Sequence, residues 1–223
     1  MAEKNVKYVW SGTMRIIHWT VFLSVVALLI TGNYIAHTPA FVAPDGEPVE
    51  TFFMAQMRLF HFLAAIVFDV AIFLSIYLIF FSTFHAPWRD LLPSPNNLKK
   101  FWIQLKYYFK LSGENIDYEY EDPIDIMSFL SFHILAVLLI FTGFALYVAP
   151  YAINWWWPAL LHLATDWVVA LFGGLQNVRS AHHIMWWLIL VWFIVHVYFQ
   201  IWKSIKFKTD NINAIISGYR FKK

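Results

Sequence analysis

The chain has 223 residues, of which 60% are hydrophobic, 20% are aromatic and only 13% are charged, with a formal net charge of +2. Soluble domains are roughly 45 to 50% apolar and 25% charged, so this composition excludes an ordinary soluble domain and indicates a polytopic membrane protein with one domain, residues 1–223. There is no cysteine, which excludes disulfides, thiolate-ligated iron–sulfur clusters and thioether-linked haem. Any redox centre therefore needs histidine or another non-thiol ligand.

Four apolar stretches are each long enough to cross a hydrocarbon core of about 30 Å, which needs about 20 residues. In chain order they are residues 16–35, 57–81, 126–148 and 182–202. Residues 1–11 are polar and lead directly into the first stretch, so we expect no cleavable signal peptide and a first span that acts as its own targeting signal. The predicted fold is an all-α integral membrane four-helix bundle with interfacial helices.

Three further segments are predicted to lie outside these spans. Residues 97–111 place aromatic side chains among lysines, which is typical of an amphipathic helix on the inner face. Residues 117–125 are acidic and predict a solvated link. Residues 155–175 are apolar enough for a fifth span, but a crossing there would carry the basic C-terminal tail outside, so we expect an aromatic-rich helix on the outer face.

Basic residues predict the orientation, because cytoplasmic loops carry an excess of lysine and arginine. They gather before the first span, between the second and third spans, and after the fourth. The opposite loops carry only Arg58 and Arg179. Both chain termini are therefore predicted to be cytoplasmic.

An arginine stands three residues before a histidine at the start of three apolar stretches. The pairs are Arg15 with His18, Arg58 with His61, and Arg179 with His182. Positions i and i+3 share a helix face, so each pair puts an imidazole just inside the membrane and a guanidinium at its surface. This arrangement suits a b-type haem, whose iron takes imidazole ligands and whose propionates meet arginine. A single pair would be better explained by a snorkelling arginine and an interface histidine, but the threefold repeat favours haem.

The orientation predicts which histidines can meet. His18 opens the first span on the cytoplasmic side, whereas His61 and His182 open the second and fourth spans on the outer side. His196 lies about 21 Å beyond His182 on the same helix and about 40° from the same face. We therefore predict that His61 and His182 hold an outer haem and that His18 and His196 hold an inner one. Bis-histidine haems have no open iron position and suit electron transfer.

These histidines lie in short motifs that extend along nearly the whole chain. The motifs are Arg15-Ile16-Ile17-His18-Trp19, Thr31-Gly32, Met57-Arg58-Leu59-Phe60-His61-Phe62, Thr142-Gly143-Phe144-Ala145-Leu146-Tyr147, His182-His183, His196-Val197-Tyr198 and Ser217-Gly218-Tyr219-Arg220. Together they resemble the cytochrome b subunit of membrane-bound nickel–iron uptake hydrogenases. Thr20 and Ala181 stand where larger apolar residues are expected, and neither is a predicted ligand.

The resemblance implies two b haems on the four histidines named above and a quinone as electron acceptor. It also implies a multi-pass subunit of the bacterial inner membrane, partnered by the small and large subunits of a periplasmic hydrogenase and working in a respiratory chain. The chain itself is expected to have no hydrogen-activating site. Two alternatives stay open: the cytochrome b subunit of a formate dehydrogenase or thiosulfate reductase, and a histidine-based metal or proton transporter.

Three more polar residues have open roles. His133 lies nearer the cytoplasmic end of the third span and does not repeat a ligand position, so it is either a core histidine or part of a quinone site. Asp69, at mid-depth in the second span, is costly to bury and suggests either a proton relay or a hydrogen bond to another helix. His183 points about 100° away from His182 and is a second-choice ligand.

Overall fold

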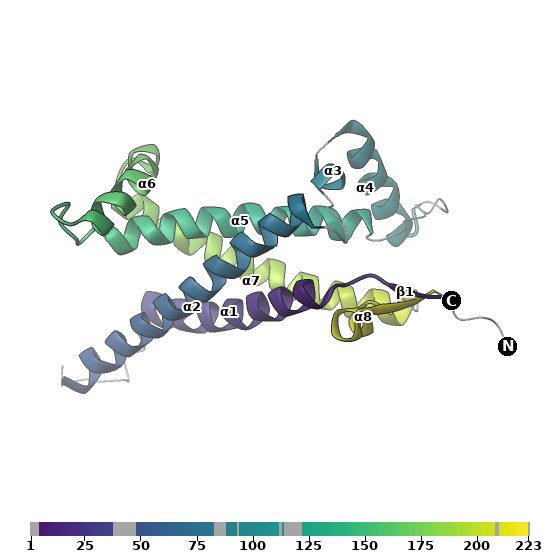
Figure 1. Cartoon of the computed structure of the whole chain (residues 1–223), viewed down its shortest axis with the longest axis horizontal. Coiled ribbons are helices and arrows are strands. Elements are labelled where there is room, and N and C mark those ends of the chain that lie inside the picture. Colours follow the sequence, from purple (N-terminus) through teal and green to yellow (C-terminus); the bar gives the residue numbers. More distant parts are fainter. Residues whose placement is uncertain are drawn as a thin grey trace. The chain divides into compact units, whose positions relative to one another are not determined.

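The computed structural model describes residues 5–37, 48–82, 88–92, 94–111, 113, 122–207 and 210–222. Four of the described helices are long and apolar enough to cross a membrane (Figure 1). They are α1 (Gly12–Ala36), α2 (Pro48–Phe81), α5 (Pro123–Val148) and α7 (Leu175–Lys206). This confirms the predicted all-α membrane fold, and each helix extends beyond its predicted apolar span.

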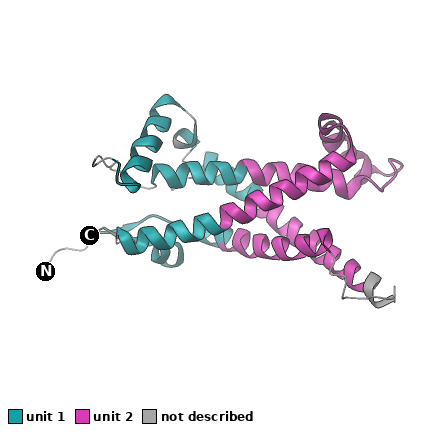
Figure 2. Ribbon diagram, turned by 180° about the vertical axis from the view of Figure 1, so that it is seen from behind, with its two compact units in different colours: residues 1–18, 72–133, 194–223 teal, residues 19–71, 134–193 magenta. Residues whose placement is uncertain are grey.

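The chain divides into two compact units (Figure 2). Unit 1 comprises residues 1–18, 72–133 and 194–223, and unit 2 comprises residues 19–71 and 134–193. Each of the four long helices contributes one segment to each unit, so the two ends of one helix belong to different units. A single domain over the whole chain stays a prediction.

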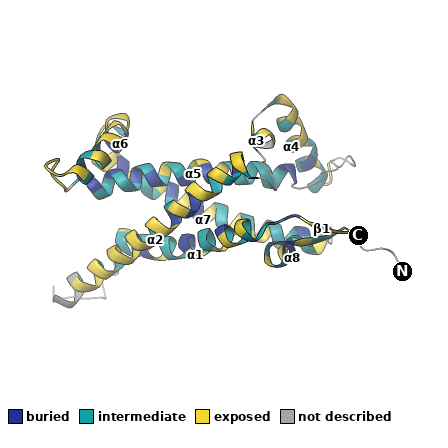
Figure 3. Ribbon diagram, viewed as in Figure 1, coloured by how far each residue is buried: buried dark blue, intermediate teal, exposed yellow. Residues whose placement is uncertain are grey.

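α2 is exposed along much of its length (Figure 3), and many of its exposed side chains are large and apolar. Leu63, Ile66, Val70, Phe73 and Tyr77 are all exposed and recur every three or four residues. This spacing places them on one helix face. An apolar face of this kind is stable against lipid tails, in agreement with an integral membrane protein.

α4 (Pro95–Tyr108) forms in the polar segment between α2 and α5. The Ser94 side chain accepts a hydrogen bond from the backbone nitrogen of Asn97 at 3.2 Å, which caps the first turn. Pro95 occupies the first helical position, where its missing N–H has no intrahelical partner to lose. The helix agrees with the one predicted over residues 97–111, and the short helix α3 (Trp88–Leu91), which precedes it, was not predicted.

α6 (Trp156–Phe172) forms in the aromatic segment before α7 and ends at Gly173, whose φ of 73° is left-handed. With 17 residues, α6 is not one of the four described helices that are long and apolar enough to span a membrane. This agrees with the prediction of four spans. Val168 of α6 packs with Ala145 and Val178 in a buried cluster of unit 2. The helix therefore packs against the adjoining ends of α5 and α7.

A two-stranded antiparallel ribbon joins the two ends of the described chain within unit 1. β1 (Asn5–Tyr8) pairs with β2 (Tyr219–Lys222), which follows the short helix α8 (Asn211–Ser217). Between α8 and β2, Gly218 has a φ of 92°, and a Cβ there would lie 2.7 Å from the Tyr8 ring, so only glycine fits. The ribbon was not predicted, because its strands are short and no local turn connects them.

One expectation from the sequence is wrong for the residues that the structure describes. Residues 117–121 of the predicted solvated acidic link lie outside the described part of the chain, but Asp122 is only 1% exposed and Asp125 belongs to the first turn of α5. Both carboxylates pair with Lys203 of α7. Burial of these carboxylates is stabilised by the opposite charge of Lys203. It was not predicted because Lys203 is distant from them in the sequence.

Candidate functional site

Unit 2 brings the predicted outer pair of histidines together. The imidazoles of His61 on α2 and His182 on α7 lie close enough for their charges to interact. Thr31 Oγ1 on α1 lies 2.9 Å from His61 Nδ1, and Thr142 Oγ1 on α5 lies 2.8 Å from His182 Nδ1. Each imidazole is thus held to a neighbouring helix by a threonine hydroxyl.

The glycine that follows each threonine leaves room for the edge of the imidazole. A Cβ on Gly32 would lie 3.3 Å from His61 Cε1 and 3.2 Å from Trp186 Nε1. A Cβ on Gly143 would lie 3.4 Å from His182 Cε1. In each Thr-Gly dipeptide the hydroxyl contacts Nδ1 and the glycine lies beside the ring. A side chain at position 32 would crowd the rings of His61 and Trp186, whereas a Cβ at position 143 would make an ordinary contact with His182.

Unit 1 brings the predicted inner pair together. His18 on α1 and His196 on α7 also lie within range of each other's charge. The Trp10 ring stands edge-on to the His18 ring, with 6.0 Å between their centroids. Asp125 and Lys203 act electrostatically on His196. This pair therefore lies beside an acidic and a basic side chain of its own unit.

The charged groups of unit 1 form a buried ionic cluster. Lys203 is fully buried and pairs with Asp122 and Asp125. The Tyr108 hydroxyl donates a hydrogen bond to Asp122, and Gln200 Nε2 donates one to Asp125 at 2.8 Å. Burial raises the pKa of Asp122 and the charge of Asp125 raises it further, whereas Lys203 and the Tyr108 hydrogen bond lower it. Asp122 is thus a carboxyl group whose proton affinity is increased.

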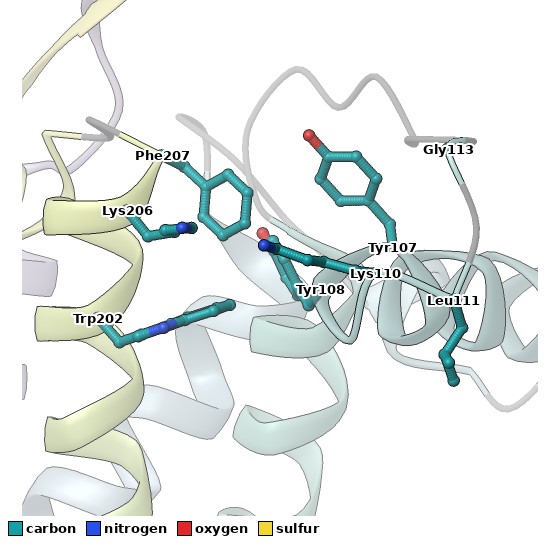
Figure 4. A pocket seen from close by; sticks show the side chains of 8 residues that line it. All are labelled: Tyr107, Tyr108, Lys110, Leu111, Gly113, Trp202, Lys206 and Phe207. Carbon is teal, nitrogen blue, oxygen red and sulfur yellow. The ribbon is translucent and has the colours of Figure 1, made fainter.

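Tyr108 also connects the ionic cluster to a pocket of about 500 Å³ at the ends of α4 and α7 (Figure 4). The pocket is lined mainly by aromatic and lysine side chains, namely Tyr107, Tyr108, Trp202, Phe207, Lys110 and Lys206. In Figure 4 the Lys110 amine lies next to Tyr108, whereas the Tyr107 hydroxyl points away from it. The volume of the pocket is within the range of about 300 to 1,000 Å³ that is usual for small-molecule sites.

The three arginines of the Arg-x-x-His pairs have different local contacts. Arg15 Nη1 donates a hydrogen bond to the carbonyl oxygen of Ile216 at 2.6 Å. Arg179 Nη1 donates one to Gln176 Oε1 at 2.8 Å, and Arg58 is exposed. Their contact with haem propionates stays a prediction.

His133 has both ring nitrogens engaged within unit 1. Its Nδ1 donates to the carbonyl oxygen of Phe129 at 2.8 Å, and its Nε2 lies 2.9 Å from Ser75 Oγ. These bonds tie α5 to α2 and favour the core-histidine interpretation, while a role at a quinone site stays a prediction. In unit 2, His183 stacks on Trp186 with 5.9 Å between the ring centroids, and its role as a second-choice ligand is likewise untested.

The residues of the two pairs fit haem b. Haem b can be held without covalent attachment by two histidine side chains, and each unit offers two imidazoles from two different helices. In unit 2 the missing side chain of Gly32 leaves space beside the His61 ring. The threonines were missed as functional residues, although the repeated Thr-Gly dipeptide was a visible signal. From the sequence alone, however, the dipeptide does not reveal that its threonine contacts a histidine of another helix.

Comparison with known proteins agrees with this geometry. Residues 9–218 match the family model of prokaryotic cytochrome b561. The chain is 31% identical to the probable Ni/Fe-hydrogenase B-type cytochrome subunit of Cupriavidus necator, over 97% of this chain and 88% of that protein. The protein of the same name from Azotobacter vinelandii is 30% identical over 98% of this chain and 90% of its own length. The probable Ni/Fe-hydrogenase 1 B-type cytochrome subunit of Escherichia coli K12 is 29% identical, over 96% of this chain and 90% of that protein. This chain therefore belongs to the prokaryotic cytochrome b561 family, whose name implies haem b.

Proposed function

We propose that this protein is the membrane subunit of a nickel–iron hydrogenase and passes electrons through two b haems to quinone. The observation that carries the proposal is the presence of two histidine pairs, each brought together within its own unit. The names of the relatives support the hydrogenase partner. The chain would have no hydrogen-activating site and would serve as the route from the partner to the quinone pool.

His61 and His182 would hold the outer haem, and His18 and His196 the inner one. When bound, each haem supplies one-electron chemistry at its iron. With one imidazole from each histidine of a pair as ligands, each haem would serve electron transfer rather than oxygen chemistry. Thr31 and Thr142 hold the outer imidazoles, and Arg15, Arg58 and Arg179 would neutralise propionates near the membrane surface.

The outer haem would face the hydrogenase, with both chain termini in the cytoplasm and the helices in the bacterial inner membrane. The distribution of basic residues supports this orientation. On α6, Trp156, Leu163 and Leu171 are 76%, 80% and 72% exposed, which is an apolar surface suited to a partner subunit or to the membrane. The hydrogenase small subunit, with its iron–sulfur clusters, would deliver electrons on that side.

Quinone becomes quinol by taking up two electrons and two protons, so its site needs a proton donor near the inner haem. His133 is one candidate. Tyr108 is another, because it lines an aromatic pocket and is backed by Asp122 and Lys203. If either residue donates the proton, removing it should slow quinone reduction by roughly 10²-fold or more.

His133→Ala and Tyr108→Phe distinguish the two candidates in the intact complex. In both variants hydrogen should still reduce both haems, while only the variant that lacks the donor reduces quinone slowly. Tyr107→Phe is the matched control, because the Tyr107 hydroxyl points away from Tyr108 (Figure 4). Normal quinone turnover in both variants would place the acceptor site elsewhere.

The whole proposal is tested with the native complex reconstituted in proteoliposomes. Hydrogen should reduce the b haems, and quinone reduction should build a membrane potential, because protons are released outside and taken up inside. A formate dehydrogenase or thiosulfate reductase large subunit that co-purifies in place of a hydrogenase would contradict the partner. A purified chain without a reduced-minus-oxidised haem spectrum would favour the transporter alternative.

A further inference from the structure

Two threonines in unit 2 make the same pair of hydrogen bonds in two different helices. Thr31 Oγ1 lies 2.7 Å from the carbonyl oxygen of Ala27 and 2.9 Å from His61 Nδ1. Thr142 Oγ1 lies 2.7 Å from the carbonyl oxygen of Leu138 and 2.8 Å from His182 Nδ1, and it also lies 3.1 Å from the carbonyl oxygen of Leu139. Both hydroxyls are buried, with Thr31 7% exposed and Thr142 1% exposed.

Counting protons assigns the direction of each bond. A hydroxyl group has one proton to donate, and a backbone carbonyl oxygen can only accept. The threonine proton therefore goes to the carbonyl one helical turn earlier, and the hydroxyl oxygen must accept from the imidazole. Each histidine consequently carries its proton on Nδ1 and has the lone pair on Nε2.

We infer that Thr31 and Thr142 are positioning residues that select the Nδ1–H tautomer of His61 and His182 and aim Nε2 at the haem iron. The inference rests on the proposed function, since it takes these histidines as ligands. A metal-bound imidazole normally donates its other N–H to a fixed acceptor, which orients the ring and increases the basicity of the ligating nitrogen. Here that acceptor is a hydroxyl whose own proton already goes to a backbone carbonyl. In the opposite tautomer Nδ1 would be an acceptor too, and the hydroxyl would have no proton left to donate to it.

The adjoining glycines complete the arrangement. Gly32 and Gly143 leave the Cε1 edge of each ring close to the backbone of α1 and α5. Cε1 lies between the two ring nitrogens, so the same edge that is packed against the helix links the anchored Nδ1 to the ligating Nε2. The dipeptide therefore restrains both the tautomer and the rotation of the ring.

Threonine-to-valine and threonine-to-serine substitutions separate positioning from packing. Valine retains the shape of threonine but removes the hydroxyl, whereas serine retains the hydroxyl and loses a methyl group. We expect Thr31→Val and Thr142→Val to weaken retention of the outer haem by about 10- to 100-fold, the usual effect of losing such a partner. The midpoint potential of that haem should rise, because a less basic imidazole stabilises ferric iron less. Thr31→Ser and Thr142→Ser should stay close to the unmodified protein.

Haem retention is measured as the rate of haem transfer to excess apomyoglobin, and the potential by optical redox titration with the other haem as internal reference. Thr165→Val is the matched control, because Thr165 is equally buried in unit 2 and its hydroxyl donates to the carbonyl oxygen of Leu161. Complete loss of haem in the valine variants with retention in the serine variants would also support positioning. Equal impairment by valine and serine, or unchanged retention and potential with valine, would overturn it.

Histidine variants distinguish failure of this inference from failure of the proposed function. If His61→Ala and His182→Ala both keep the outer haem, the ligand assignment itself is wrong. If they lose it while the threonine-to-valine variants match the unmodified protein, only the positioning role is wrong.

Discussion

The histidine pair of unit 2 is anchored by neutral hydroxyls, whereas the pair of unit 1 lies beside a buried ionic cluster. Thr31 and Thr142 contact the first pair, and Asp125 and Lys203 act on His196 of the second. Local charge and hydrogen bonding tune the potential of a bound haem. Two haems with the same imidazole ligands should therefore differ in potential and in their response to protons.

The difference matches the two tasks in the proposed electron route. Electrons entering at unit 2 need no proton, and its hydroxyl anchors are neutral over the physiological pH range. In the proposed route, quinone reduction near unit 1 would consume protons. There Asp122 has a raised pKa and accepts a hydrogen bond from Tyr108. Proton-linked behaviour is thus expected of unit 1 rather than of the histidine pair in unit 2.

The largest expected effect is selective loss of one haem. His61→Ala or His182→Ala should remove the outer haem and stop electron entry from the partner. His18→Ala or His196→Ala should remove the inner haem and leave the outer one reducible by hydrogen. Difference spectra of the purified variants check this. Loss of a haem in His183→Ala but not in His182→Ala would mean that His183, and not His182, is the ligand.

The ionic cluster gives the next largest effect. Lys203→Met leaves the buried Asp122 and the partly buried Asp125 without their cation. It should lower the free energy of unfolding by about 3 to 5 kcal/mol. Lys206→Met, one turn further along α7 at an exposed position, is the control and should have little effect. The two variants are compared by denaturant unfolding in the same detergent. Equal midpoints would show that the cluster contributes little to the stability of unit 1.

The arginines should tune the outer haem without ligating its iron. A hydrogen bond to a charged propionate contributes about 1.5 to 3 kcal/mol, so Arg58→Gln and Arg179→Gln should weaken haem binding by a comparable amount. Removing a positive charge favours ferric haem, so the potential should fall, opposite in sign to the threonine variants. Redox titration checks this, with Arg89→Gln as control because Arg89 lies over the Trp88 ring in unit 1. An unchanged potential in both variants would favour the snorkelling interpretation.

The smallest effect concerns the contact between the partly exposed His162 and the exposed Asp166 on α6, outside the predicted spans. The hydrogen bond to Asp166 raises the pKa of His162 above 6.5, and the carbonyl oxygen of Tyr151 raises it further. Protonated His162 is therefore favoured in the folded state, and its stabilisation is present below pH 6.5 and lost as the pH rises through the raised pKa. The difference in melting temperature between the unmodified protein and His162→Gln should shrink from pH 5.5 to pH 8.5. A difference independent of pH would contradict this assignment.

Features that depend on one helix at a time were predictable from the sequence. The spans follow from apolar length, and the candidate ligands His18, His61, His182 and His196 follow from their depth and face. The contacts of Thr31 and Asp122 were not predictable, because their partners His61 and Lys203 come from other helices. The β1–β2 ribbon was missed for the same reason, since its pairing links the two ends of the chain.

The haem content of the purified chain tests the central proposal most directly. Acid acetone should extract all of the haem, because no cysteine is available for thioether bonds. A pyridine haemochrome assay against protein concentration should give two haems b per chain, and redox titration should resolve two midpoint potentials. One haem per chain, or none, would contradict the assignment of one haem to each histidine pair.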